Sequence, residues 1–155
     1  TTLFRSGCMD SSPKSANVVP SQVTFTADCR SSDIRSIRTV MEAFRETLRE
    51  STEHCPDLSF EISRTLQADP AAMDMRLKKI IEDAADELSL SSMHLLSGAG
   101  HDTMNFKNMC PLAMIFVPSK GGRSHCPEEW TDYRQISDGA DVLLRTIIKA
   151  AAHEI

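Results

Sequence analysis

The sequence predicts an α/β fold, because strand and helix patterns alternate along most of its 155 residues. Up to about residue 67 the predicted order is strand, helix, strand, and beyond it helix, strand, strand, helix. Two patterns support this prediction. Apolar and polar residues alternate as in a strand with one buried face, and apolar residues elsewhere recur at the spacing of one helix face.

The first part opens without a clear period, since residues 1–16 are rich in Ser, Thr and Pro and predict a linker or a frayed end. Residues 23–29 alternate between apolar and polar side chains, which predicts a strand. Ser32 and Asp33 are natural N-caps, and residues 34–51 carry apolar side chains at helical spacing. Alternation returns over residues 58–62 and predicts a second strand.

The second part begins with a helix-start signal, because Asp69 suits an N-cap and Pro70 the first helical position. A short strand over residues 93–96 leads into a glycine-rich turn, and residues 113–117 form an apolar run typical of a strand covered on both faces. A last helix closes the chain. Its apolar side chains are expected to face inward: Ile136, Ala140, Leu143, Leu144, Ile147, Ile148 and Ala151.

Composition narrows the class of function. A net charge of -5 argues against nucleic acids and anionic membranes as partners, since both favour a basic surface. No apolar run approaches the roughly 20 residues of a membrane span, and the first residues lack the layout of a signal peptide. The five cysteines form no C-x-x-C pair, so reduced thiols and a cytoplasmic location are expected.

The first candidate site joins Asn17, just before the strand at 23–29, to Arg30 at the end of that strand. A guanidinium offers a fork of donors that suits a carboxylate, and an asparagine amide can add another donor. The alternative interpretation is a turn asparagine and a solvated arginine, because such residues are mostly exposed.

The second candidate site is the glycine-rich turn at residues 97–102, which contains Gly100 and His101. Small residues let a backbone approach a ligand, and His101 beside Asp102 suggests a catalytic role. The pattern lacks the Gly-Lys-Ser/Thr ending of a phosphate-binding loop. A glycine-rich turn with a capping aspartate is the alternative interpretation.

The third candidate site is the loop at residues 121–129, where His125 stands between a predicted buried strand and a helix. Imidazole is the commonest metal ligand, and the carboxyl end of a strand is where open α/β sheets place their sites. His54, His94 and His153 show no spacing that would complete a metal site, so a solvated loop histidine is the alternative.

Taken together and in this order, the three segments resemble the amidase/hydantoinase/carbamoylase family. The segments that carry the resemblance are residues 17–20 with 24–30, residues 97–102, and residues 114–119 with 121–129. This family includes N-carbamoyl-L-amino acid hydrolases and allantoate amidohydrolases, and it belongs to a superfamily of dinuclear-metal aminoacylases and carboxypeptidases. The likeness extends over nearly the whole chain from about Ser15.

The resemblance implies two partial domains. Residues 1–67 correspond to the latter half of an inserted α+β lid or dimerisation domain, and residues 68–155 to the C-terminal segment of a dinuclear-metal hydrolase catalytic domain. It further implies a homodimer formed through the lid and an enzyme whose missing N-terminal half completes the fold.

The resemblance also assigns roles to residues. Asn17 and Arg30 are expected to grip a substrate carboxylate, Gly100 and His101 to line the substrate pocket, and His125 to bind metal. The implied cofactor is a pair of divalent ions (zinc, manganese, cobalt or nickel). The implied reaction is hydrolysis of the ureido or amide C–N bond of an N-carbamoyl amino acid or a related ureide.

The chain departs from the family pattern in one large respect. The family's other metal ligands and its general-base glutamate belong to segments that these 155 residues do not contain, so no catalytic residue is expected in this chain. Alone, the chain is expected to be inactive. The alternative hypothesis is a truncated, catalytically incompetent homologue that binds a carboxylate or pairs with a partner.

Overall fold

A computed structural model describes residues 2–152, so His153 lies outside the described part of the chain. The chain forms two compact units, Thr1–Pro70 and Ala71–Ile155, and each is described by itself. The division falls close to the predicted boundary at 67/68. The identification of the two parts as lid and catalytic segment stays a prediction.

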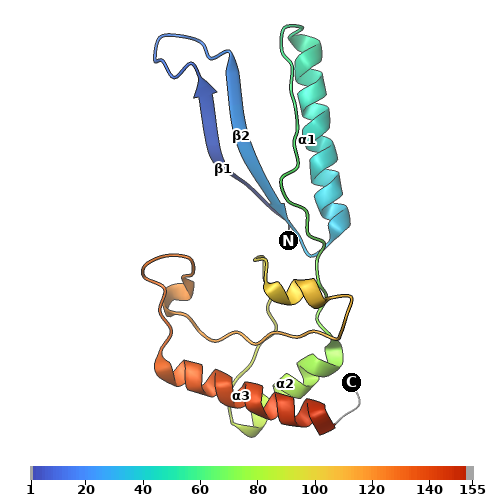
Figure 1. Ribbon diagram of the computed structural model, residues 1–155, viewed down its shortest axis with the longest axis vertical. Coiled ribbons are helices and arrows are strands. Elements are labelled where there is room, and N and C mark those ends of the chain that lie inside the picture. Colours follow the sequence, from blue (N-terminus) through green and yellow to red (C-terminus); the bar gives the residue numbers. More distant parts are fainter. Residues whose placement is uncertain (1, 153–155) are drawn as a thin grey trace. The chain divides into compact units, whose positions relative to one another are not determined.

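The first unit is built on an antiparallel hairpin (Figure 1). Strand β1 spans Leu3–Ser12 and strand β2 spans Gln22–Arg30, which confirms the predicted strand at 23–29. The prediction of a linker over residues 1–16 is wrong. A register irregularity between Ser6 and Cys8 interrupts the alternation of β1, so its strand character is hidden in the sequence.

Helix α1 spans Ile34–His54 and packs on one face of the hairpin (Figure 1). Asp33 caps it as predicted, its side chain accepting a hydrogen bond from the Arg35 amide. The Phe44 ring lies 6.2 Å from that of Phe4 and 6.0 Å from that of Phe25, measured between centroids. This aromatic cluster joins helix to sheet and leaves the Thr24, Thr26, Asp28 and Arg30 face of β2 on the other side.

Residues 58–62 do not form a strand, so that prediction is wrong for the described chain. The Leu58 amide bonds to the Cys55 carbonyl in a turn, and the following residues run on as irregular backbone. A strand is defined by its hydrogen bonds to a neighbouring strand. Among the described residues β1 and β2 pair only with each other, so residues 58–62 have no strand to pair with.

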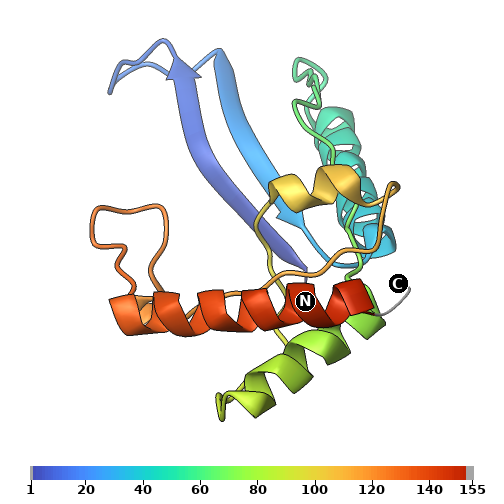
Figure 2. The same ribbon diagram turned by 60° about the horizontal axis from the view of Figure 1, so that its bottom comes forward.

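The second unit is organised by two helices that pack against each other, α2 at Met75–Glu87 and α3 at Tyr133–Ala152 (Figure 2). Ala84 and Ala85 of α2 and Val142 of α3 form its small core, with Ile115 and three other apolar residues packed around it. The last predicted helix is confirmed. Helix α2 begins later than predicted, because Asp74 rather than Asp69 caps it, accepting bonds from the amides of Arg76 and Leu77.

Residues 93–96 and 113–117 are irregular backbone, so the two strands predicted there are wrong for the described chain. The apolar run at 113–117 nevertheless packs on the helices, since Ile115 contacts the core and Val117 lies against Gly139. Two short 3-10 helices complete the unit, η1 at Asp102–Phe106 and η2 at Lys120–Gly122.

The face of α3 predicted to point inward is largely exposed. Val142 and Thr146 are its buried residues, whereas four of the predicted apolar residues keep half or more of their surface: Leu143 (50%), Leu144 (58%), Ile147 (56%) and Ile148 (61%). The apolar side chains recur at helical spacing as predicted, but the described residues include too few helices and strands to cover the apolar face that they form. Within the described residues no helix is long and apolar enough to span a membrane.

Candidate functional site

Asn17 lies in the loop that joins β1 to β2, beyond the last residue of either strand. Its side-chain Oδ1 accepts a hydrogen bond of 2.7 Å from the Ser15 hydroxyl. The loop is exposed, so the amide is presented to solvent at the tip of the hairpin. At this position the Asn17 side chain is accessible to a ligand or to another polypeptide segment.

Arg30 ends β2 and is held by a carboxylate two residues earlier in the same strand. Its Nε donates to both Asp28 oxygens, at 3.0 and 2.9 Å, and its Nη2 donates to Asp28 Oδ2 at 2.6 Å. Residues i and i+2 of a strand share a face, which places the two side chains together. The hydrogen bonds from Arg30 hold the pKa of the Asp28 carboxyl below its ordinary value.

Asn17 and Arg30 are not brought together by the hairpin. Strand β2 runs from Gln22 to Arg30, about 26 Å at about 3.3 Å per residue, and Asn17 lies beyond its far end. A single substrate carboxylate spans only a few ångströms. Joint binding by these two residues of one chain therefore does not follow from the structure, and their shared role stays a prediction.

His101 is oriented by two contacts in the second unit. Its Nε2 lies 2.7 Å from the Ser97 hydroxyl, and its ring meets the Phe116 ring edge-on with centroids 5.5 Å apart. His101 itself is the N-cap residue of η1. A part-buried imidazole with one nitrogen engaged and one face against an aromatic ring is suited to present its other nitrogen in a fixed direction.

Gly100 stands beside this imidazole in open space. A Cβ built on Gly100 would meet no atom within 4 Å, so packing within the described residues does not demand glycine there. The backbone is accessible at this point, as the pocket prediction requires.

His125 lies in a loop that is closed on itself by hydrogen bonds. The Lys120 amide donates to the Trp130 carbonyl at 2.8 Å, and the Ser119 hydroxyl donates to the Arg123 carbonyl at 2.8 Å. His125 adopts a left-handed backbone with φ 57°, and its amide donates to Glu129 Oε2 at 2.8 Å. The imidazole is exposed, so this loop holds it out to solvent at a defined place.

The described residues do not form a complete metal site. Within residues 2–152 no three His, Cys, Asp or Glu side chains lie together as a metal ion requires. His125 is chemically suited to be a ligand, but further ligands have to come from elsewhere.

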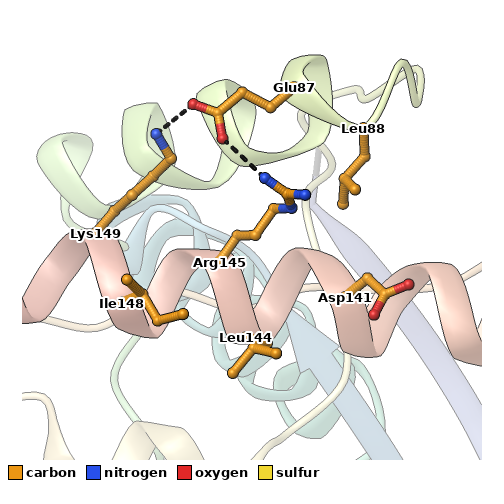
Figure 3. Close-up of a pocket in the computed structure, with 7 residues that line it drawn as sticks. All are labelled: Glu87, Leu88, Asp141, Leu144, Arg145, Ile148 and Lys149. Atoms are coloured by element: carbon orange, nitrogen blue, oxygen red, sulfur yellow. Dashed lines mark hydrogen bonds and ion pairs between the residues drawn. The ribbon is translucent and has the colours of Figure 1, made fainter.

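A groove between α2 and α3 involves none of the predicted site residues (Figure 3). The Glu87 carboxylate in it accepts hydrogen bonds from Lys149 Nζ at 2.5 Å and from Arg145 Nη1 at 3.3 Å. Because both cations of α3 are ion-paired with this carboxylate of α2, the groove is best explained as the ion-paired seam between two helices.

Sequence reasoning missed two polar pairs. One is His94, whose Nε2 meets the Glu82 carboxylate of α2; a separation of twelve residues follows no helix or strand period. The other is the pairing of Asp28 with Arg30. Its signal was present in the sequence, because oppositely charged residues two apart on a strand face the same side.

Comparison with known proteins shows which class of protein contains this α/β arrangement and these three polar segments. Residues 5–149 match peptidase family M20/M25/M40. The chain belongs to this family, within its hydantoinase/carbamoylase group of amidases. The predicted family and α/β fold class are thereby confirmed.

Individual relatives show how much of a family member the chain represents. The N-carbamoyl-L-amino-acid amidohydrolase of Paenarthrobacter aurescens is 31% identical over 146 residues, which are 94% of this chain and 35% of that protein. The allantoate amidohydrolase of Escherichia coli (strain K12) is 30% identical over 145 residues, again 94% of this chain and 35% of that protein.

A solved structure gives the same picture. The crystal structure of a hydantoinase/carbamoylase-family amidase from Burkholderia multivorans superposes with a TM-score of 0.88 at 28% identity. The superposition covers 99% of this chain and 37% of that one. The chain therefore spans about a third of the length of the relatives it matches.

Proposed function

We propose that this chain is the C-terminal part of a metal-dependent amidohydrolase that cleaves the ureido or amide C–N bond of an N-carbamoyl amino acid or related ureide. The observation that carries the proposal is the match to the family over residues 5–149, with relatives named as N-carbamoyl-L-amino-acid and allantoate amidohydrolases. These substrates share a carboxylate and a ureido group.

Arg30 and Asn17 are proposed to bind the substrate carboxylate. Because the length of β2 separates them, they serve one carboxylate only if two copies of the hairpin contribute, Arg30 from one copy and Asn17 from the other. This arrangement makes the proposed homodimer a requirement of the site. The exposure of the loop around Asn17 supports it, since the residue is accessible to a second copy.

His125 is proposed to be one ligand of a metal centre whose other ligands and general-base glutamate lie in additional polypeptide. When bound, a pair of divalent ions (zinc, manganese, cobalt or nickel) supplies an activated water and polarises the scissile carbonyl. Asn17 and Arg30 then bind the substrate carboxylate, and His101 presents its imidazole beside the substrate pocket. The free cysteines accord with a cytoplasmic location.

A second function is favoured by one specific observation. Within residues 2–152 no group of three potential metal ligands exists, so a protein consisting of this chain alone would be a carboxylate-binding or partner-pairing homologue without turnover. The two functions predict different behaviour toward metal.

The test is ammonium release from an N-carbamoyl amino acid by the complete protein that carries these residues. Activity should disappear with a chelator and return when zinc, manganese, cobalt or nickel is added, whereas residues 1–155 alone should give no turnover with any of them. Chelator-insensitive hydrolysis would refute the metal-dependent mechanism. Carboxylate binding without turnover by the complete protein would favour the second function.

A further inference from the structure

An aspartate lies between two arginines on the exposed face of the hairpin. Asp28 shares this face of β2 with Arg30, and Arg5 of β1 stands directly opposite Asp28 in the strand register. The other face of the hairpin carries the rings that pack on Phe44. The three charges therefore face away from the hydrophobic contact with α1.

The contact between Asp28 and Arg30 fixes the direction of the guanidinium. Both carboxylate oxygens lie at hydrogen-bond distance from Nε, at 3.0 and 2.9 Å, and one of them lies 2.6 Å from Nη2. A guanidinium bound along its Nε–Nη2 edge cannot rotate freely about its last side-chain bonds. An arginine otherwise samples many rotamers, and ordering them costs free energy when a ligand binds.

The pair contributes little to the stability of the fold. The Arg30 and Asp28 side chains keep 48% and 50% of their surface exposed, and exposed ion pairs stabilise proteins by only about 0–1 kcal/mol. Stability alone is therefore a weak reason for a three-contact geometry at this place.

A carboxylate beside an anion-binding arginine also repels an incoming anion, and this cost has to be offset. Arg5 supplies the compensation, because the two arginines and Asp28 together carry a net positive charge at this end of the hairpin. The nearby arginines lower the pKa of Asp28, with the Arg30 hydrogen bond as the largest cause, so the aspartate stays ionised at neutral pH.

We propose that Asp28 is a positioning residue, which pre-orients the Arg30 guanidinium for a substrate carboxylate while Arg5 offsets its negative charge. This inference rests on the proposed function of Arg30. Asp28 does not touch the substrate; it acts by removing rotamer freedom from the arginine that does.

The first readout is the Arg30 Nε–Hε signal in NMR spectra of the complete protein. In Asp28→Asn the hydrogen exchange of Hε should be faster by about two- to fivefold, the range expected for an exposed ion pair. Asp28→Glu keeps the charge and should retain part of the protection. The matched control is Glu46→Gln, which removes an exposed arginine–carboxylate pair of 2.9 Å on α1 and should leave Arg30 unchanged.

The second readout is steady-state kinetics of the complete protein with an N-carbamoyl amino acid. Asp28→Asn should raise KM by about two- to fivefold at unchanged kcat, since substrate binding weakens without a change in the chemical step. Unchanged Hε exchange in Asp28→Asn would overturn the positioning role even if Arg30 binds substrate. Altered exchange with unchanged KM in both Asp28→Asn and Arg30→Ala would instead show that the proposed function of Arg30 has failed.

Discussion

At the scale of single residues, the predicted site residues differ in how firmly their surroundings fix them. The Arg30 guanidinium is hydrogen-bonded to Asp28, and the His101 ring contacts Ser97 and Phe116. The direction of the His125 imidazole follows instead from the left-handed backbone at that residue. The sequence motifs identified these residue types and their order. They could not reveal the distance between Asn17 and Arg30, because that distance depends on how the hairpin is laid out in space.

Arg30→Ala in the complete protein should raise KM for carboxylate substrates by about ten- to a hundredfold with little change in kcat. The reason is loss of charge-assisted hydrogen bonds, each worth about 1.5–3 kcal/mol. Steady-state kinetics checks this. Arg35→Ala is the matched control, because Arg35 also pairs with an aspartate but at the start of α1. Equal kinetics for wild type and Arg30→Ala would contradict the assigned role.

Replacement of His125 by asparagine should remove metal and activity together from the complete protein. Asparagine is preferred to alanine because it tolerates the left-handed backbone at φ 57° and so leaves the loop geometry in place. Metal content by elemental mass spectrometry is the measurement. His94→Ala, outside this loop, serves as the control. A His125→Asn protein that keeps both ions would show that His125 is not a ligand.

At the scale of elements, helices were more predictable than strands. The helices α1 and α3 follow from local periodicity and caps, and the structure confirms both. Strand pairing is not local. The bulge near Gly7 concealed β1, and the strand-like segments 58–62 and 113–117 find no partner within the described residues. The N-cap of α2 is Asp74 and not the predicted Asp69. The Asp74 amide also donates a hydrogen bond to the Leu112 carbonyl, a tertiary contact that cannot be predicted from local sequence.

The contact between Gly139 of α3 and Val117 leads to a prediction about the stability of the second unit. In Gly139→Ala the new Cβ would lie 2.4 Å from Val117 Cγ1. Alanine normally favours a helix over glycine by about 1 kcal/mol, but this overlap should instead destabilise the unit by about 1–3 kcal/mol. Thermal unfolding of residues 1–155 measures the effect.

The matched variant is Gly139→Ala combined with Val117→Ala, which removes the overlapping methyl groups. Relative to Val117→Ala alone, the added alanine should then be neutral or stabilising. A stabilising effect of Gly139→Ala in the wild-type background would mean that α3 does not approach Val117 closely.

At the scale of the whole molecule, the chain carries part of a family site on about a third of a family member's length. Large apolar side chains stay exposed along α3, and within the described residues His125 belongs to no group of three possible metal ligands. Both observations have one explanation in the proposed function: additional polypeptide covers the helix and completes the metal centre.

The most direct test of this account is the intact mass, under denaturing conditions, of the natural protein that contains these residues. The proposed function predicts a single polypeptide well over twice the 17.2 kDa of this chain, with the missing metal ligands in its additional residues. A natural protein of 17.2 kDa would contradict the account and leave a carboxylate-binding or partner-pairing homologue in its place.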